Sequence, residues 1–256
     1  MRRLRGFAAA VALFGLSAVS AVHAQPPPAA PPQSPRESAA LDVTGQWVAI
    51  VNEDWRWRMV TPPHGDYASV PLNDEGRRVA DLWEASSDGR CEAFGAVGVM
   101  RMPTRLRVAW DGDDALVIET DAGRQTRRLT FDRAAAAGGR SLQGHSIAEW
   151  VRPLPPPGGQ GLGGAGGGQQ RAGGYLKVTT TNLLPGWLRR NGVPYSEDAV
   201  LTEYVDRFRA PNGDEWLMVT AIVDDPKYLN TRYITSSHFR REPGEARWNP
   251  QACRAS

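Results

Sequence analysis

The sequence predicts an all-β fold, in which an antiparallel meander of strands forms a closed or nearly closed β-barrel with one short helix. Many short segments either alternate apolar and polar residues with a period of two or run apolar for four or five positions, as strands do. Turn-forming residues separate several of these segments at hairpin distance. A barrel leaves no exposed sheet edge, which favours it over the alternative, a two-sheet β-sandwich.

The strand pattern is clearest in eight segments. They are residues 47–51, 55–60, 106–110, 116–120, 176–180, 201–208, 216–223 and 233–240. Residues 111–114, 121–123 and 211–214 are rich in Asp, Asn and Gly, and we expect each of them to join two strands in a hairpin.

One helix is predicted over residues 73–84. Asn73 is suited to cap the first turn, and Asp74 and Glu75 place negative charge near the helix N-terminus, where it is favourable. One face of this helix is apolar and carries Val79, Leu82 and Trp83.

Residues 1–24 have the features of a secretory signal peptide. Basic residues precede an apolar run that is too short to span a bilayer, and Val22-His23-Ala24 fits the small-x-small cleavage pattern. Cleavage after Ala24 predicts a periplasmic or secreted protein whose mature chain has no integral membrane segment.

Composition divides the mature chain into a leader and one domain. Residues 25–40 are rich in Pro, Ala, Ser and Gln, and they predict a disordered leader. The single β-rich domain covers residues 41–256. A second low-complexity stretch, residues 153–174, predicts a disordered Gly/Pro-rich loop inside this domain.

The charge of the mature chain argues against nucleic-acid binding. Removing the signal peptide takes away three arginines and no acid, so Lys+Arg falls from 30 to 27 against 28 Asp+Glu, a net charge of about −1. The basic isoelectric point of the precursor therefore gives no reason to expect a nucleic-acid or anionic-lipid partner.

Two cysteines, Cys91 and Cys253, remain in a chain that is sent to an oxidising compartment, and they predict a disulfide. No metal is predicted, because neither Cys has a second ligand at short spacing and His64, His145 and His238 are scattered along the chain. No cofactor is predicted either.

Several landmarks follow in order after Asp42. They are PLNDEGR at 71–77, Cys91, QGHSIAEW at 143–150, RNGVPYS at 190–196, LTEY at 201–204 and VDDPKY at 223–228. In these landmarks the chain resembles a widespread family of uncharacterised secreted bacterial proteins, often found in proteobacteria. The resemblance implies export and a single fold over nearly the whole domain. It implies no catalytic residue, because no activity is established for the family.

The segment around His145 is the most suggestive of catalysis. In a strand His145 and Glu149 lie on the same face, so they could look into one cavity as an acid–base pair. The alternative is that His145 bonds a turn carbonyl and Glu149 faces water. On a later strand, Glu203 and Arg207 share a face, and we expect them to form an ion pair.

Nine tryptophans are many for a domain of this size, and they either fill the core or line a ligand cavity. Trp55 and Trp57 share a strand face in the predicted 55–60 strand. The candidate ligand-binding residues are Trp55, Trp57, Trp110, Trp150 and Trp216.

Three functional hypotheses follow. The leading one is a lipocalin-like barrel that binds a small apolar or aromatic molecule inside it. The second is a cofactor-independent enzyme that uses His145 and Glu149, so the sequence leaves open whether the protein is an enzyme. The third is an envelope interaction module, which a filled barrel interior favours. The oligomeric state and the identity of the ligand are also left open.

Overall fold

The computed structural model of the protein describes residues 33–87, 91–152 and 173–253. Within these residues the strands are β1 (Gly45–Ala49), β2 (Arg105–Asp111), β3 (Ala115–Thr120), β4 (Ala122–Gly123), β5 (Thr126–Thr130), β6 (His145–Val151), β7 (Tyr175–Thr181), β8 (Gly186–Arg189), β9 (Val193–Tyr195), β10 (Val200–Arg209), β11 (Glu215–Asp224), β12 (Tyr233–Glu242) and β13 (Gln251–Ala252). The predicted signal peptide, leader residues 25–32 and loop residues 153–172 lie outside the described residues.

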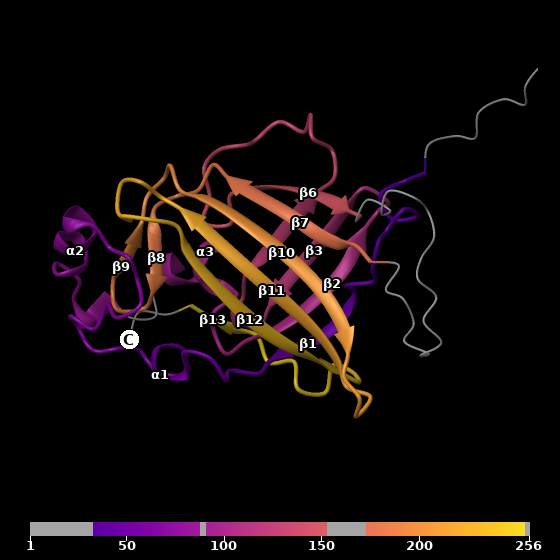
Figure 1. Cartoon of the computed structure of the whole chain (residues 1–256), viewed down its shortest axis with the longest axis horizontal. Helices are drawn as coiled ribbons and strands as arrows, with labels where there is room; N and C mark the ends of the chain where they lie inside the picture. The colour runs from indigo at the N-terminus through magenta and orange to yellow at the C-terminus, as the bar shows by residue number, and fades with distance from the viewer. Residues whose placement is uncertain (1–32, 88–90, 153–172, 254–256) are drawn as a thin grey trace, which may run out of the picture. The chain divides into compact units, whose positions relative to one another are not determined.

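Nine of the described strands close into one barrel (Figure 1). They follow one another in the order β1-β12-β11-β10-β7-β6-β5-β3-β2, and β1 also pairs with β2, which closes the ring. The prediction of an all-β barrel is therefore confirmed, and the alternative of a two-sheet sandwich is not the observed fold.

The predicted hairpins join β2 to β3, β3 to β5, and β10 to β11, and each of these strand pairs is antiparallel. The meander is interrupted once. β5 and β6 pair in parallel, with Leu129 opposite Ser146, because the connection between them returns to the end of the barrel from which β5 starts.

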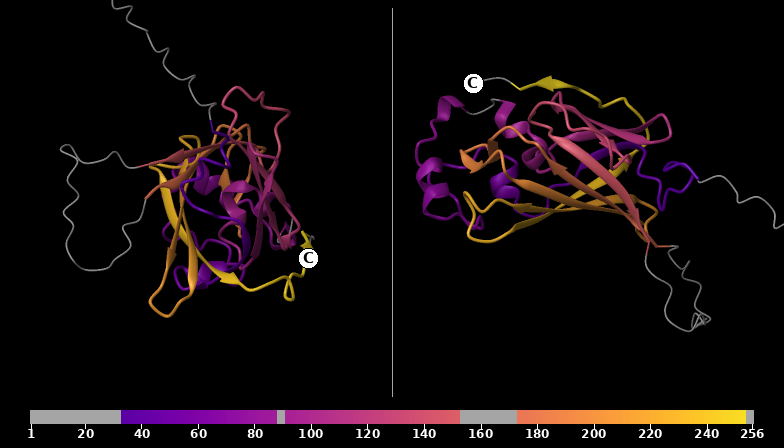
Figure 2. Two further views of the ribbon diagram at one scale, coloured as in Figure 1. Left: turned by 90° about the vertical axis from the view of Figure 1, so that its right-hand side faces the viewer. Right: turned by 90° about the horizontal axis from the view of Figure 1, so that it is seen from above.

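The described helices are short. They are α1 (Trp55–Arg58), α2 (Asp74–Ala80), η1 (Ala85–Ser87), η2 (Cys91–Phe94) and α3 (Ala96–Val99). Figures 1 and 2 show α2 at the same end of the barrel as the small β8–β9 sheet. None of the helices in the described ranges has the length and apolar character needed to cross a membrane.

The predicted strand at 55–60 is wrong, because this segment forms α1 and the turn after it. Its alternation of apolar and polar residues meets the strand criterion, but a strand also needs a partner. Both edges of β1 are already occupied, by β2 and β12, so the chain that follows β1 finds no free edge beside it. Asp54 then turns the chain with a left-handed backbone, at a φ of 52°.

The predicted helix is observed as α2. It begins as expected, with the Asn73 side chain accepting a hydrogen bond from the N–H of Gly76 at 2.8 Å. It ends at Ala80 instead of residue 84, because the N–H groups of Leu82 and Trp83 bond carbonyl oxygens three residues back, at Val79 and Ala80, and do not continue the α-helical pattern.

Inward-facing residues of the barrel strands form a continuous apolar core. Trp47 of β1 and Phe239 of β12 are completely buried in it, together with alternate residues of the other strands. A second apolar cluster fills the end of the barrel near α2 and includes Leu72, Leu183 and Tyr195.

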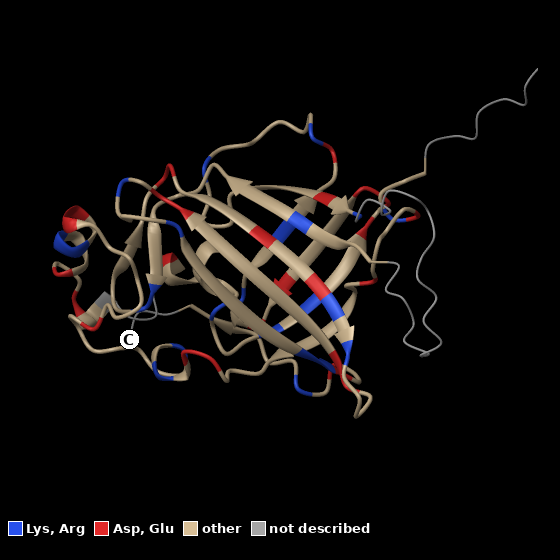
Figure 3. Cartoon of the chain, viewed as in Figure 1, with Lys and Arg blue, Asp and Glu red and all other residues tan. Residues whose placement is uncertain are grey.

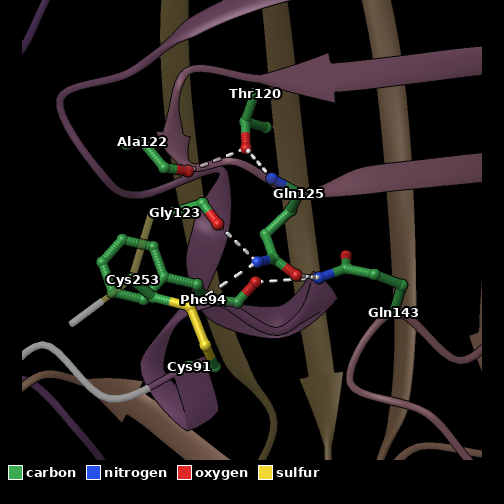
Figure 4. Close-up of a disulfide and its surroundings, with 8 residues drawn as sticks. All are labelled: Cys91, Phe94, Thr120, Ala122, Gly123, Gln125, Gln143 and Cys253. Carbon is green, nitrogen blue, oxygen red and sulfur yellow. Dashed lines mark hydrogen bonds between the residues drawn. A yellow bond between two sulfur atoms is a disulfide. The ribbon is translucent and has the colours of Figure 1, made fainter. Parts of the chain in front are cut away.

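The predicted disulfide between Cys91 and Cys253 is confirmed (Figure 4). Its Cα atoms are 5.2 Å apart, and it joins η2 to the segment after β13 across 162 residues of sequence. β13 pairs in parallel with β4, and the Gln143 amide beside the disulfide donates to the Phe94 carbonyl oxygen at 2.9 Å. The disulfide therefore joins η2 to the C-terminal segment, which the β13–β4 pairing holds next to β3 and β5.

Replacing both Cys91 and Cys253 by Ser should lower the free energy of unfolding by about 2–5 kcal/mol, because the cross-link restricts a long loop in the unfolded chain. Urea unfolding of the oxidised protein, the reduced protein and the double Ser variant measures this. We expect the reduced protein and the variant to coincide. A variant as stable as the oxidised protein would contradict the expectation.

Candidate functional site

The five candidate tryptophans do not converge on one cavity. Trp55 and Trp57 lie on α1, and Trp216 stacks on Phe208 on the outer face of the sheet. Only Trp110 and Trp150 are brought together, with ring centroids 6.4 Å apart at the end of the barrel away from α2.

The aromatic rings at that end close the barrel under the N-terminal segment. Phe131 stacks on both Trp110 and Trp150, at 5.6 and 5.5 Å. The Trp150 indole N–H donates to the carbonyl oxygen of Pro35 at 2.8 Å, so the last residues of the predicted leader lie against the barrel. Composition alone does not reveal this contact, because it is made through the backbone.

The barrel interior between the two ends is filled by its own side chains. The described residues leave an internal cavity of about 20 Å³, lined by apolar side chains such as Leu116, Leu176 and Val219. That volume corresponds to little more than one water molecule, whereas drug-sized ligands occupy about 300–1,000 Å³. A barrel is compatible with ligand binding, but this interior is not shaped around a ligand.

One polar cluster crosses the interior between the two apolar regions. Arg127 and Glu203 form an ion pair at 2.5 Å, with both side chains only 4% exposed. The same guanidinium donates to the hydroxyl of Thr180 at 2.7 Å and to that of Ser146 at 3.3 Å. Every charge of the cluster therefore has a partner.

The expected ion pair between Glu203 and Arg207 is wrong. Glu203 points into the barrel, while Arg207 lies at the strand end and pairs with Glu215 at 2.8 Å. The two side chains share a strand face in the pattern. However, only β7 and β6 separate β5 from β10 in the barrel, and the Arg127 guanidinium reaches Glu203 in the interior.

His145 and Glu149 lie on the outer face of β6, because the alternate residues Ser146 and Ala148 are the buried ones. Glu149 forms an ion pair with Lys177 at 2.8 Å and a second one with Arg133. The hydrogen bond from Lys177 lowers the pKa of Glu149, which keeps this carboxylate ionised and poorly suited to donate a proton. The acid–base hypothesis stays a prediction.

A pocket rich in arginine lies where α1, α3 and β8 meet. It has a volume of about 20 Å³ and opens to solvent. Its walls are formed by Trp57, Arg58, Gly98, Arg101, Met102, Leu188, Arg189 and Arg190. The three parts of the chain that supply these residues are far apart in the sequence.

Local structure explains how these segments approach one another. The left-handed turn at Asp54 starts α1 and lets the Asp54 carboxylate accept from Arg101 at 2.5 Å. Asp is one of the residues that tolerates this backbone. On the other wall, a Cβ atom on Gly98 would come within 2.6 Å of the Ala93 carbonyl oxygen and 2.9 Å of the Trp187 carbonyl oxygen. Only glycine therefore lets α3 pack this closely on β8.

Two of the arginines are neutralised by acids before α1. Arg58 pairs with Glu53 and donates to the Arg101 carbonyl oxygen at 2.8 Å, while Arg101 pairs with Asp54. Burial and the neighbouring Arg101 lower the pKa of Arg58. Figure 3 shows the acidic stretch before α1 next to the basic residues of that helix.

Arg189 differs from these neighbours. It is only 6% exposed, and both terminal nitrogens of its guanidinium lack a hydrogen-bond partner among the described residues. Its guanidinium lies 5.1 Å from the ring centroid of Trp57, and Nη2 of Arg58 also has no partner there. A buried, unsatisfied guanidinium is costly, so the pocket is suited to an external anion that would satisfy it.

Sequence reasoning missed this pocket. Its arginines come from three segments that are separated by tens of residues, and each has the local pattern of an ordinary surface arginine. The only local signal is the repeated Trp-Arg pair at residues 55–58, which fitted a strand equally well. Among the described residues, no group of three or more His, Cys, Asp or Glu side chains could hold a metal ion.

Comparisons of the chain with protein-family models, curated proteins and solved structures found no match. The resemblance to secreted bacterial proteins therefore stays a prediction, and the candidate site depends on its own geometry.

Replacing Glu203 by Leu should destabilise the protein by about 3–5 kcal/mol, because Arg127 is left as an uncompensated buried charge. Replacing Arg127 by Met in the same chain should restore most of the lost stability. The apolar Met and Leu side chains then fill much of the space of Arg127 and Glu203 without a buried charge. Urea unfolding of the wild type, the single variant and the double variant measures both effects. Equal stability of the two variants would contradict the paired-charge interpretation.

Proposed function

We propose that the protein is an exported binding protein that holds an oxyanion group, a phosphate or a carboxylate, of a small ligand in the arginine pocket. The observation that carries this proposal is the buried guanidinium of Arg189, whose terminal nitrogens have no partner among the described residues. The planar guanidinium fork matches the geometry of carboxylate and phosphate, and such charge-assisted hydrogen bonds are the strong ones.

The surrounding residues support an anion more than a neutral ligand. Four arginines line the pocket, and the described acids that pair with two of them are Glu53 and Asp54. Arg189 thus adds a positive charge whose terminal nitrogens have no partner among the described residues, although the net charge of the mature chain is close to zero. Trp57 provides an aromatic wall, so a ligand with a flat or apolar body next to its anionic group also fits.

The volume of the pocket limits what enters it. About 20 Å³ is little more than one water molecule, so a single oxygen of the anion enters and the rest of the ligand lies at the open mouth. This places binding at the end of the barrel instead of inside it, and replaces the apolar interior ligand of the sequence-based hypothesis.

Export is part of the proposal. The disulfide supports a location outside the cytoplasm, in agreement with the predicted signal peptide and the resemblance to secreted bacterial proteins. We propose cleavage after Ala24, which N-terminal sequencing of the mature protein tests.

Replacing Arg189 by Met should weaken binding of inorganic phosphate and of benzoate by about tenfold or more, because a charge-assisted hydrogen bond contributes roughly 1.5–3 kcal/mol. Isothermal titration in a chloride buffer measures the affinity. Arg209→Met is the matched control, since Arg209 is an exposed arginine at the far end of β10. This variant should bind both anions like the wild type.

The same Arg189→Met variant should be more stable than the wild type in anion-free buffer, by about 1–3 kcal/mol, because it removes an unsatisfied buried polar group. A purely structural Arg189 would make the variant less stable. Loss of stability together with wild-type anion affinity would therefore overturn the proposed function.

A further inference from the structure

Three exposed apolar side chains, the apolar cluster, belong to the segment that also lines the arginine pocket. Trp55 is 63% exposed, Met59 51% and Val60 61%, and all three belong to one segment of six residues. The structure exposes six large hydrophobic side chains among the described residues, so half of them are in this segment. Single exposed apolar residues are ordinary, whereas a local group of them indicates an interaction surface.

The same segment also supplies two of the residues that line the pocket. Trp57 and Arg58 line it, while Trp55, Met59 and Val60 are turned to solvent. This division follows from α1, since residues 55 and 59 are one helical turn apart and share a face. A partner that contacts the exposed face therefore lies within a few residues of the anion site.

We propose that this segment docks on a lipid bilayer that contains anionic phospholipids, with Trp55, Met59 and Val60 in the interfacial region and a lipid phosphate in the arginine pocket. The inference rests on the proposed anion site and identifies the source of the anion. It describes peripheral binding to the membrane surface, which needs no membrane-spanning segment.

The chemistry of the two surfaces fits a phospholipid. Tryptophan prefers the boundary between headgroups and acyl chains, and Met and Val side chains gain by leaving water. A pocket that admits only one oxygen suits a lipid phosphate whose other atoms and attached chains remain outside it, in the layer that the apolar side chains enter. A single amphipathic partner, a phospholipid, thus matches both the arginine pocket and the apolar cluster.

The overall charge of the protein makes this a local attraction. With a net charge of about −1, the mature chain has no general affinity for an anionic surface. Binding must then depend on the pocket and the apolar cluster together, and replacement of either one should abolish most of it.

The test is sedimentation of the full mature protein with vesicles of equimolar phosphatidylglycerol and phosphatidylcholine, compared with vesicles of phosphatidylcholine alone. We expect binding to the first and at least about tenfold weaker binding to the second, because anionic lipid adds electrostatic attraction. The variant Trp55→Ser/Val60→Ser should bind the anionic vesicles about tenfold more weakly or worse, since both side chains lose their apolar contact with the bilayer.

A matched control comes from the chain itself. Leu82 and Ile234 are 69% and 61% exposed in other parts of the structure, so Leu82→Ser/Ile234→Ser removes similar apolar surface without touching the α1 segment. This control should bind anionic vesicles like the wild type. Arg189→Met should lose both vesicle binding and binding of inorganic phosphate.

The outcomes separate this inference from the proposed function. If Trp55→Ser/Val60→Ser binds phosphate and vesicles like the wild type, the docking surface is overturned and the anion site stands. If Arg189→Met loses phosphate but keeps vesicle binding, the lipid phosphate is not the occupant of the pocket. If the wild type binds phosphate but no vesicles, the anion comes from a free ligand or a protein partner, and the bilayer is excluded.

Discussion

Closure of the barrel through β1 is the constraint on which the rest of the structure depends. This strand of five residues pairs with β12 on one side and with β2 on the other. Once both edges are occupied, alternate side chains of every barrel strand must pack against one another, as the complete burial of Trp47 and Phe239 shows. The chain that leaves β1 has no sheet edge to join and becomes the α1 segment. Because the barrel is closed, its own side chains fill the interior. The arginine pocket lies outside this interior, where α1, α3 and β8 meet.

Two of the buried arginines, Arg127 in the barrel and Arg189 on β8, differ in how the fold completes their hydrogen bonds. Arg127 is surrounded by Glu203, Thr180 and Ser146, so its charge is balanced inside the fold and serves the structure. Arg189 is equally buried, but its terminal nitrogens have no such partners among the described residues. Burial alone does not distinguish a structural charge from a functional one. The distinction lies in whether the protein itself satisfies the donors of the guanidinium. Donors that the fold leaves unsatisfied form hydrogen bonds only when a ligand binds.

The sequence predicts local features well and long-range partners poorly. Period-two patterns located most of the strands, and two cysteines allow only one intramolecular disulfide, so the Cys91–Cys253 bond could be predicted. The alternation at residues 55–60 was misleading because periodicity says nothing about a free sheet edge. Glu203 was assigned to Arg207 for a similar reason: spacing along one strand reveals neighbours on that strand, whereas Arg127 is 76 residues away. The arginine pocket could not be predicted, since it exists only where three distant segments meet.

A pocket of this kind needs a rigid surrounding structure, and the fold supplies it on both sides. α3 is held against β8 by the close approach that Gly98 permits, and the preceding η2 is fixed by the disulfide to the C-terminal segment. On the opposite wall, Glu53 and Asp54 fix Arg58 and Arg101 in ion pairs. An unsatisfied Arg189 would otherwise turn toward solvent and recover its hydration. The closed barrel and the disulfide thus stabilise a fold that tolerates one costly buried charge, which is the kind of local conflict expected at a binding site.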